Sequence, residues 1–475
     1  MRLKKIDIKD WRILHHPQWL LTSTCCVVIG ENGSGKSSLI ELVVRIFNEV
    51  FLRLEKPTYK GELDGYYLNY ERELTDGTTC DVVIESGYLE GSHARDLHVT
   101  INGSPCPMDM EEDIRRIMPT NIITYYAGDT NRLEKICNHY LDTTIKAIIR
   151  NGNNYSLQPL KMPPICPFIY SDLIHLPTSL FSLIVGCDRS ETLAKLGIDR
   201  ASVTLQLWLK RPQWANKEGG GILGNRSPLL EGFLKGLMEY AMMMELHDKK
   251  TIELEIDANS ISDFLNEIKI EKKGVFLFEM FNLLQYNGFI DDIELFWNKI
   301  GDERLENPIK ADYFSEGEKQ MVLTSAMIEF WDMEHCLFLF DEPDTFLHPK
   351  WQTCFLPEVQ KNLRNSQAII TTHSVLMVSS VLPENELFVM EKGRIIPYGR
   401  NTFGMDTNDI NSLVMNTPPR NQEAETLIQS IRQDITLRHL EDAKRKLDEL
   451  RYYNVSSLEI NRLTSTINRI ESIGR

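Results

Sequence analysis

The sequence predicts an α/β fold, in which helices cover a mixed β-sheet that is accompanied by an antiparallel β subdomain. A continuous apolar run at residues 25–29 leads through a glycine-rich turn into a helical stretch. Two more apolar runs, 336–340 and 367–372, are typical of strands buried in a parallel sheet. Residues 80–103 carry β-branched residues and end in Asn102-Gly103, which predicts an antiparallel hairpin.

The remaining segments are assigned from their periodicity. Alternation over residues 3–8 predicts a half-buried strand; we also expect a helix over 111–119 and a strand over 121–126. Charged stretches after residue 418 repeat with a period near 3.6, which predicts a C-terminal helical hairpin or a small helical bundle. The predicted domains are an N-terminal lobe (1–130), a mostly helical insertion (131–300), a second lobe (301–418) and a helical extension (419–475).

The composition excludes several classes of protein. Of the 475 residues, 42% are hydrophobic and 25% are charged, as in a globular protein with its own core. The net charge of −16 argues against a uniformly basic nucleic-acid coat but leaves a local basic groove open. The nine cysteines include no C-x-x-C pair, and no apolar run is long enough to cross a membrane. We therefore expect a cytoplasmic protein with reduced thiols and no membrane partner.

The glycine-rich turn is a complete G-x-x-x-x-G-K-S motif. Its glycines let backbone N–H groups cradle the phosphates of ATP, and the following helix directs its positive end at the same place. Lys36 would bridge the phosphates, and Ser37 would coordinate Mg²⁺. The predicted nucleotide-binding residues are Gly30, Asn32, Gly33, Ser34, Gly35, Lys36, Ser37 and Ser38.

Two later strands end in candidate catalytic residues. Asp341 and Glu342 follow an apolar strand; Asp341 would hold Mg²⁺, and Glu342 would orient and deprotonate the attacking water. His373 follows the next apolar strand, where a γ-phosphate contact is plausible because ligands bind at the carboxyl ends of parallel strands. The alternatives are an acidic strand cap and a structural histidine.

The segment Ser315-Glu316-Gly317-Glu318-Lys319-Gln320 opens another helix. Its first turn offers a hydroxyl group and backbone donors to an anion, so Ser315, Gly317 and Glu318 are further candidate nucleotide ligands. The simpler interpretation is a helix cap.

Taken in order, these motifs resemble those of the ABC-type ATPase head. Asp341-Glu342-Pro343 with Leu347-His348-Pro349 resembles the form found in the soluble branch of RecF, OLD and Rad50-like proteins rather than in transporters. The resemblance implies an ATPase in which Ser315 of one subunit closes over ATP on another, so that ATP assembles a head-to-tail dimer. The sequence departs from the transporter pattern at His348, where a D-loop aspartate is usual. It also has no clear Q-loop glutamine, and Asn131 or Arg132 is the candidate for that position.

Within this branch, the stretch from Tyr398 to Leu413 and the helices after it look most like the Septu anti-phage ATPases (PtuA) and their retron-associated relatives. AAA-type virulence ATPases and the PARIS ATPases are also similar. The Septu resemblance implies a homo-oligomer that controls a separately encoded HNH nuclease, with nucleic acid reached through that partner. The residues after His373 lack the Asp-x-Asp spacing of a Toprim nuclease, so we expect no nuclease activity of the chain itself. A RecF-like DNA-repair ATPase without a nuclease partner is the alternative.

Overall fold

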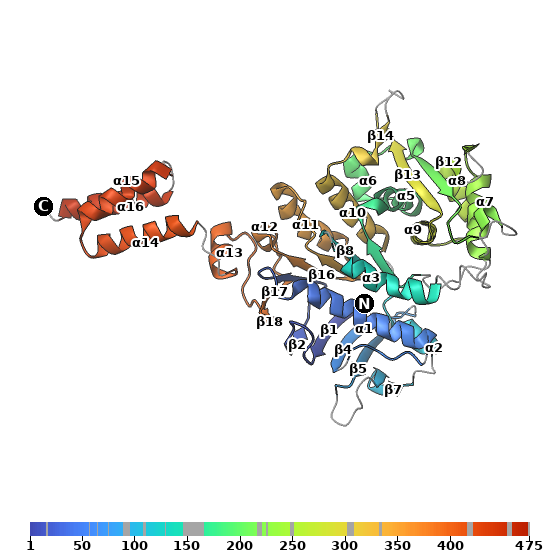
Figure 1. Cartoon of the computed structure of the whole chain (residues 1–475), viewed down its shortest axis with the longest axis horizontal. Coiled ribbons are helices and arrows are strands. Elements are labelled where there is room, and N and C mark those ends of the chain that lie inside the picture. Colours follow the sequence, from blue (N-terminus) through green and yellow to red (C-terminus); the bar gives the residue numbers. More distant parts are fainter. Residues whose placement is uncertain are drawn as a thin grey trace. The chain divides into compact units, whose positions relative to one another are not determined.

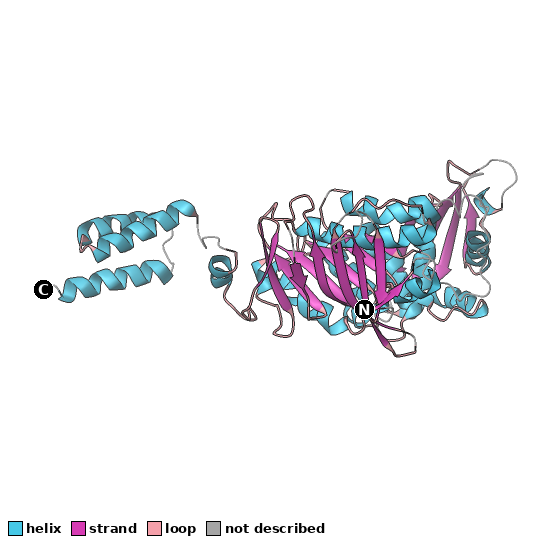
Figure 2. Cartoon of the chain, turned by 90° about the horizontal axis from the view of Figure 1, so that it is seen from below, coloured by secondary structure: helices cyan, strands magenta, loops and turns pink. Residues whose placement is uncertain are grey.

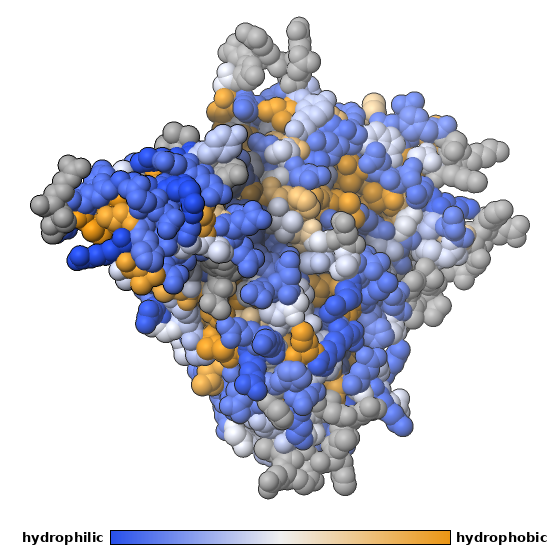
Figure 3. Space-filling model, turned by 60° about the vertical axis from the view of Figure 1, so that its left-hand side comes forward, coloured by the Kyte–Doolittle hydropathy of each residue, from blue (hydrophilic) through white to orange (hydrophobic). Residues whose placement is uncertain are grey.

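The computed structural model forms two units, Met1–Gly404 (the head unit) and Met405–Arg475 (the tail unit) (Figure 1). It describes residues 1–15, 18–56, 58–63, 65–74, 76–88, 96–107, 111–128, 130–145, 166–215, 221–224, 227–247, 251–301, 308–331, 335–415, 421–453 and 458–473. No described helix is long and apolar enough to cross a membrane. Hydrophilic residues predominate on the face shown in Figure 3, where apolar residues form small, separate patches.

The described residues of the head unit form three sheets, whose strands are magenta in Figure 2. The largest, which we call the core sheet, has the strand order β18-β17-β3-β16-β15-β8-β9 and is parallel except for β18. Every residue of β3, β15 and β16 is buried, as expected for parallel strands that are covered on both faces. Its strands are β3 (Cys25–Ile29), β8 (Ile122–Tyr126), β9 (Phe168–Ser171), β15 (Leu337–Asp341), β16 (Gln367–Thr372), β17 (Glu386–Glu391) and β18 (Arg394–Pro397).

The second sheet is the predicted antiparallel subdomain, with the order β2-β1-β4-β5-β6-β7. Asn102 and Gly103 both have positive φ angles and form the turn between its last two strands. The predicted α/β fold with an antiparallel subdomain is therefore confirmed. The strands are β1 (Arg2–Ile8), β2 (Gln18–Leu20), β4 (Tyr66–Glu73), β5 (Thr79–Ser86), β6 (Leu97–Ile101) and β7 (Ser104–Cys106).

The segment 131–300 contains more than the predicted helices. Four of its strands join β14 in an antiparallel sheet, the insert sheet, with the order β11-β12-β10-β13-β14. Buried and partly exposed residues alternate strictly along β10, so a strand period was present in the sequence although the prediction of a mostly helical insertion missed it. Residues 146–165 of this segment lie outside the described part. The strands are β10 (Thr204–Lys210), β11 (Met243–Leu246), β12 (Thr251–Asp257), β13 (Ile290–Trp297) and β14 (Ile309–Lys310).

Helices surround these sheets, and α1, which follows the glycine-rich loop, packs on β15 and β16 of the core sheet. Within the insertion, α5 and α9 pack against each other and against β13. The helices of the head unit are α1 (Lys36–Glu55), α2 (Glu111–Ile117), α3 (Arg132–Tyr140), α5 (Leu176–Gly186), α6 (Glu191–Leu196), α7 (Pro228–Glu239), α8 (Ala258–Glu267), α9 (Lys273–Tyr286), α10 (Glu316–Trp331), α11 (Pro349–Asn362) and α12 (Val375–Val378).

The tail unit is helical, as the periodicity predicts, and its described residues form three long helices packed as a bundle, the second of the two predicted arrangements. They are α14 (Gln422–Thr436), α15 (Leu440–Tyr453) and α16 (Leu458–Ile473), and α13 (Thr407–Leu413) precedes them. Apolar residues of all three, among them Ile431, Leu447 and Ile467, share one buried cluster. The unit begins at Met405, earlier than the predicted boundary at residue 419.

Candidate nucleotide-binding site

The order of strands in the core sheet gathers the predicted motifs at one edge. Strand β16 lies between β3 and β15, and all three are parallel. Gly30 follows β3, Glu342 follows β15 and His373 follows β16, so three segments far apart in the sequence meet where their strands end. This is the edge at which parallel α/β sheets bind ligands.

The glycine-rich loop requires its glycines for two different reasons. At Gly35, just before α1, φ is +115°, a conformation that side chains rarely adopt, and an added Cβ would lie 3.0 Å from Leu14. At Gly30 an added Cβ would lie 2.4 Å from the carbonyl oxygen of Met390. Helix α1 carries no acidic residue in its first turn, so the positive end of its dipole is left for an anion.

Lys36 is almost entirely buried beneath this loop. Its Nζ donates to the carbonyl oxygen of Gly30 at 2.9 Å, lies 2.6 Å from Nε2 of His373, and is 3.9 Å from the carboxylate of Glu342. Burial lowers the pKa of Lys36, although the neighbouring carboxylates oppose that shift. The structure thus brings together the lysine, the acidic residue and the histidine that the sequence singled out separately.

Asp341 is fully buried at the end of β15. Thr371 donates a hydrogen bond to its Oδ1, and Ser37 hydrogen-bonds to the same carboxyl group. Its Oδ2 is buried and has no hydrogen-bond partner among the described residues. Burial raises the pKa of Asp341. An orphaned carboxylate oxygen beside a serine hydroxyl group fits the oxygen ligands that Mg²⁺ prefers, so the predicted pair Ser37 and Asp341 suits this ion.

Glu342 is held in a strained backbone conformation. Its φ is +53°, which is uncommon for a residue with a side chain, and its N–H donates to the backbone carbonyl of Thr371 at 3.1 Å. Its carboxylate lies 2.9 Å from Nε2 of His373, and this hydrogen bond lowers the pKa of Glu342. Both side chains remain about 30% exposed, so a bound substrate and a water molecule can reach them.

The segment that begins at Ser315 forms the predicted start of α10. Ser315 and Glu318 bond reciprocally: the serine N–H donates to the glutamate carboxylate at 2.9 Å, and the serine hydroxyl accepts from the N–H of Glu318 at 3.4 Å. This is a capping box, so the cap interpretation is correct. An added Cβ at Gly317 would lie 2.7 Å from the carbonyl of Phe346, and Gln320 donates to the carbonyl of Pro343. The helix start is therefore packed against the loop that follows Glu342.

Sequence reasoning missed several supporting residues. Thr371 bonds Asp341, and Thr372 donates to the buried carboxylate of Asp344 at 2.7 Å; burial raises the pKa of Asp344. Ser374 donates to Gln352 of α11 at 2.7 Å, which ties the residue after His373 to another helix. The sequence signal for these hydrogen bonds was the pair Thr371 and Thr372 at the end of an otherwise apolar strand.

Arg132 and His348, two positions that depart from the transporter pattern, have structural roles. Arg132 bonds Glu41. Glu41 of α1 is buried and accepts hydrogen bonds from Arg12 at 2.7 Å and from Arg45 and Arg132. Burial alone would raise the pKa of Glu41, but the bonds from Arg132 and Arg45 outweigh it and lower that pKa. His348 caps α11 by accepting from the N–H of Lys350 at 3.3 Å. Asn131 precedes the first residue of α3.

Comparisons with known proteins match parts of the chain. Residues 243–379 match the family model described as an AAA domain, putative AbiEii toxin, Type IV TA system. A probable ATPase of retron Vc95 from Vibrio cholerae is 28% identical over 98 residues, which is 20% of this chain and 19% of that protein. A probable ATPase of retron Ec83 from Escherichia coli is 34% identical over 58 residues, 12% of this chain and 10% of that protein. The matched segments thus span under a fifth of these relatives.

Among solved structures, the head domain of SMC from Thermotoga maritima is 13% identical with a TM-score of 0.35; the alignment covers 84% of this chain and 98% of that one. The recombination mediator RecF bound to ATP is 14% identical with a TM-score of 0.34, covering 83% and 99%. The sheets and helices described above form the α/β fold that the sequence predicts.

Proposed function

We propose that this chain binds and hydrolyses ATP, with Mg²⁺, at the edge of the core sheet. One observation carries the proposal: Lys36, Glu342 and His373 come from three separate segments and meet within hydrogen-bonding or ion-pair distance, beside a buried Asp341 with an unpaired oxygen. The names of the retron relatives support the same activity.

Each residue has a part that its position allows. Lys36 would exchange its bond with His373 for a phosphate oxygen, with the loop N–H groups around it. Ser37 and Asp341 would hold Mg²⁺, which neutralises charge on the phosphates. Glu342, whose carboxylate stays ionised because of His373, would accept a proton from the attacking water. His373 would remain to contact the γ-phosphate.

The start of α10 would act between two copies of the chain. Ser315 is exposed, and its side chain bonds within its own helix. A second copy could therefore place Ser315, Gly317 and Glu318 against ATP on the first, which would make a head-to-tail dimer dependent on ATP. Gly317 and Gln320 pack on the loop after Glu342. Closure of the dimer would therefore act on the position of the catalytic acid, Glu342.

At the level of the cell, we propose a regulatory ATPase of a bacterial anti-phage system that controls a separately encoded HNH nuclease. The similarity of short segments to two retron ATPases and the likeness of the motifs to Septu ATPases support this role. Contact with nucleic acid would be made through the nuclease.

The test is the native mass of the tagged chain, expressed from its own locus together with its neighbouring genes. A large complex that contains a small nuclease supports the regulatory role. A lone monomer or dimer that binds duplex DNA in a salt-sensitive manner would favour the DNA-repair alternative instead.

The ATPase proposal is tested separately with Lys36→Ala. We expect loss of ATP binding and of phosphate release, because the buried ammonium is the only cation that the structure shows bonded to the loop carbonyls among the described residues. Glu423→Gln, on the exposed surface of α14, is the matched control and should hydrolyse ATP like the wild type. Equal hydrolysis by Lys36→Ala and the control would overturn the site assignment.

A further inference from the structure

Three side chains that can bind a metal project from one face at the edge of the insert sheet. Glu245 of β11 lies directly opposite Glu253 of β12. His247 is two residues beyond Glu245, and its N–H donates to the carbonyl of Thr251 at 3.2 Å, which continues the same ladder. Because side chains two residues apart in a strand share a face, all three point to the same side.

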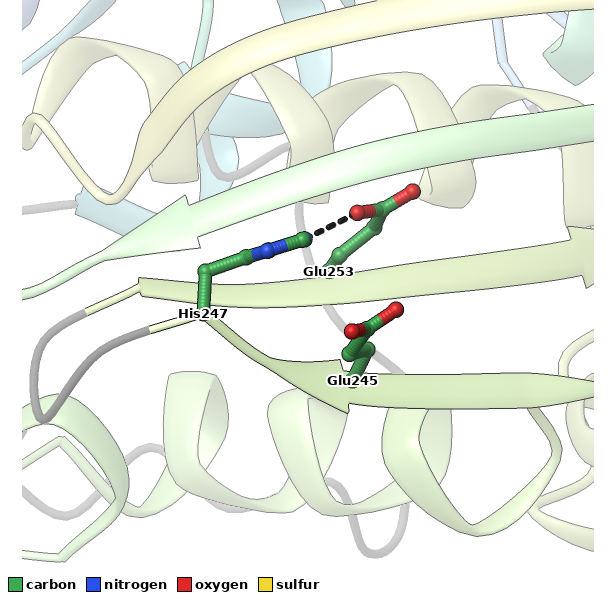
Figure 4. A group of neighbouring side chains, drawn as sticks. All are labelled: Glu245, His247 and Glu253. Carbon is green, nitrogen blue, oxygen red and sulfur yellow. Dashed lines mark hydrogen bonds and ion pairs between the residues drawn. The ribbon is translucent and has the colours of Figure 1, made fainter.

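Their ligand atoms already converge. One atom from each of Glu245, His247 and Glu253 lies within 4.8 Å of the other two, and Nε2 of His247 contacts the carboxylate of Glu253 (Figure 4). In a tetrahedral Zn²⁺ site with bonds near 2.1 Å, ligand atoms are about 3.4 Å apart. Any remaining approach, at most about 1.4 Å, is open to Glu245, since its side chain is exposed and can change rotamer.

The charges around these residues favour a cation. Like charges directly opposite each other on neighbouring strands destabilise a sheet, and Glu245 and Glu253 are such a pair. The neighbouring cross-strand pair on this face, Met243 and Glu255, adds the carboxylate of Glu255. Among the described residues, the lysines that pair with carboxylates of this sheet, Lys210 and Lys310, bond Asp291 and Glu294 on β13, away from β11.

The ligand set indicates which cation. Mg²⁺ and Ca²⁺ prefer oxygen ligands alone, whereas an imidazole with two carboxylates suits Zn²⁺ and related transition metals. Three protein ligands also leave one position for water, as in open zinc sites.

We propose that Glu245, His247 and Glu253 form a binding site for a divalent transition-metal cation, with Zn²⁺ as the expected ion. The cation would join the edge strand β11, all four residues of which are exposed, to the partly buried β12. This proposal is independent of the nucleotide site and of the proposed ATPase function.

Hydrogen exchange of the backbone amides tests the proposal directly at strands β11 and β12. The full-length chain is compared with and without Zn²⁺, with Mg²⁺ as the second ion, and peptides covering residues 243–256 are followed. We expect slower exchange in these peptides with Zn²⁺ and no change with Mg²⁺. The readout is local, so Zn²⁺ bound at Asp341 or His373 does not affect the conclusion.

Variants complete the test. His247→Ala and Glu245→Gln, both at exposed positions, should remove the protection and weaken Zn²⁺ binding at least about 10-fold, since loss of even an outer-shell partner costs 10- to 100-fold. His98→Ala, at an exposed histidine on β6, and Glu271→Gln, at an exposed position between α8 and α9, should retain it. Unchanged exchange with Zn²⁺ in the wild type, or equal protection in His247→Ala, would overturn the proposal.

Discussion

The core sheet and the insert sheet distribute their charged residues in opposite ways. In the core sheet, β3, β15 and β16 are buried throughout, so polar chemistry begins only where the strands end. In the insert sheet, one face is buried and the other carries Glu245, Glu253 and other acids along the strand bodies. A parallel sheet therefore concentrates functional groups at one edge, whereas an antiparallel sheet spreads them over a face.

The largest expected effect lies at the edge of the core sheet. Glu342→Gln should lower the rate of ATP hydrolysis about 10²- to 10⁴-fold, because the variant lacks the base that accepts the proton of water. ATP binding should remain, since Lys36, Ser37 and Asp341 are unchanged, and the ATP-bound dimer should accumulate. Single-turnover hydrolysis and native mass with ATP measure the two effects. A variant that hydrolyses ATP normally would remove Glu342 from the mechanism.

A second test compares a buried charge in the head with the exposed charges of the insert. Glu41→Gln should destabilise the chain by about 1 to 2 kcal/mol, because a buried side chain loses its charge-assisted hydrogen bonds while the three arginines stay partly exposed to water. Denaturant unfolding measures the loss. Glu271→Gln, at an exposed position between α8 and α9, should change stability by less than about 0.5 kcal/mol.

The stability difference between wild type and Glu41→Gln depends on pH in a direction that the pKa of Glu41 determines. Since the pKa of Glu41 is lowered in the folded chain, its contribution is present above the ordinary value of 4.5 and is lost as the pH falls through the lower, folded value. The stability difference between wild type and Glu41→Gln should therefore be constant near neutral pH and shrink in acid below 4.5. A difference that grows on acidification would show that Glu41 is not held ionised by its arginines.

The smallest effect is expected on the insert sheet. Glu245→Lys replaces a like-charge pair opposite Glu253 with an attractive one and should stabilise the chain by about 0.5 kcal/mol in the presence of a chelator. Glu271→Lys is the matched control with no carboxylate directly opposite. Destabilisation by Glu245→Lys in chelator would show that the two carboxylates do not repel each other in the folded chain.

The same contrast explains what could be predicted from the sequence. Lys36, Asp341 and His373 each stand next to a buried strand in the chain, so a short segment contains both the strand and its functional residue. Glu41 and Arg132 are brought together by tertiary packing, which no short segment records. Glu245 and Glu253 lie in one short segment, but they face each other only because of the register of a hairpin that the sequence analysis did not predict. The insert strands were missed because only β10 alternates cleanly, while β11 is exposed throughout.

Neighbouring strands of the core sheet come from distant parts of the sequence, and this affects how the protein is made. Ile29, at the end of β3, pairs in register with Thr372, roughly 340 residues later in the chain. At 5–20 residues per second, a ribosome needs about 20 to 70 s to supply that partner strand. Until then the loop around Lys36 lacks the neighbouring strand β16, and His373, which follows that strand, has not been synthesised. If ATP binds at this edge as proposed, a nascent chain can bind it productively only after residue 373 has been synthesised.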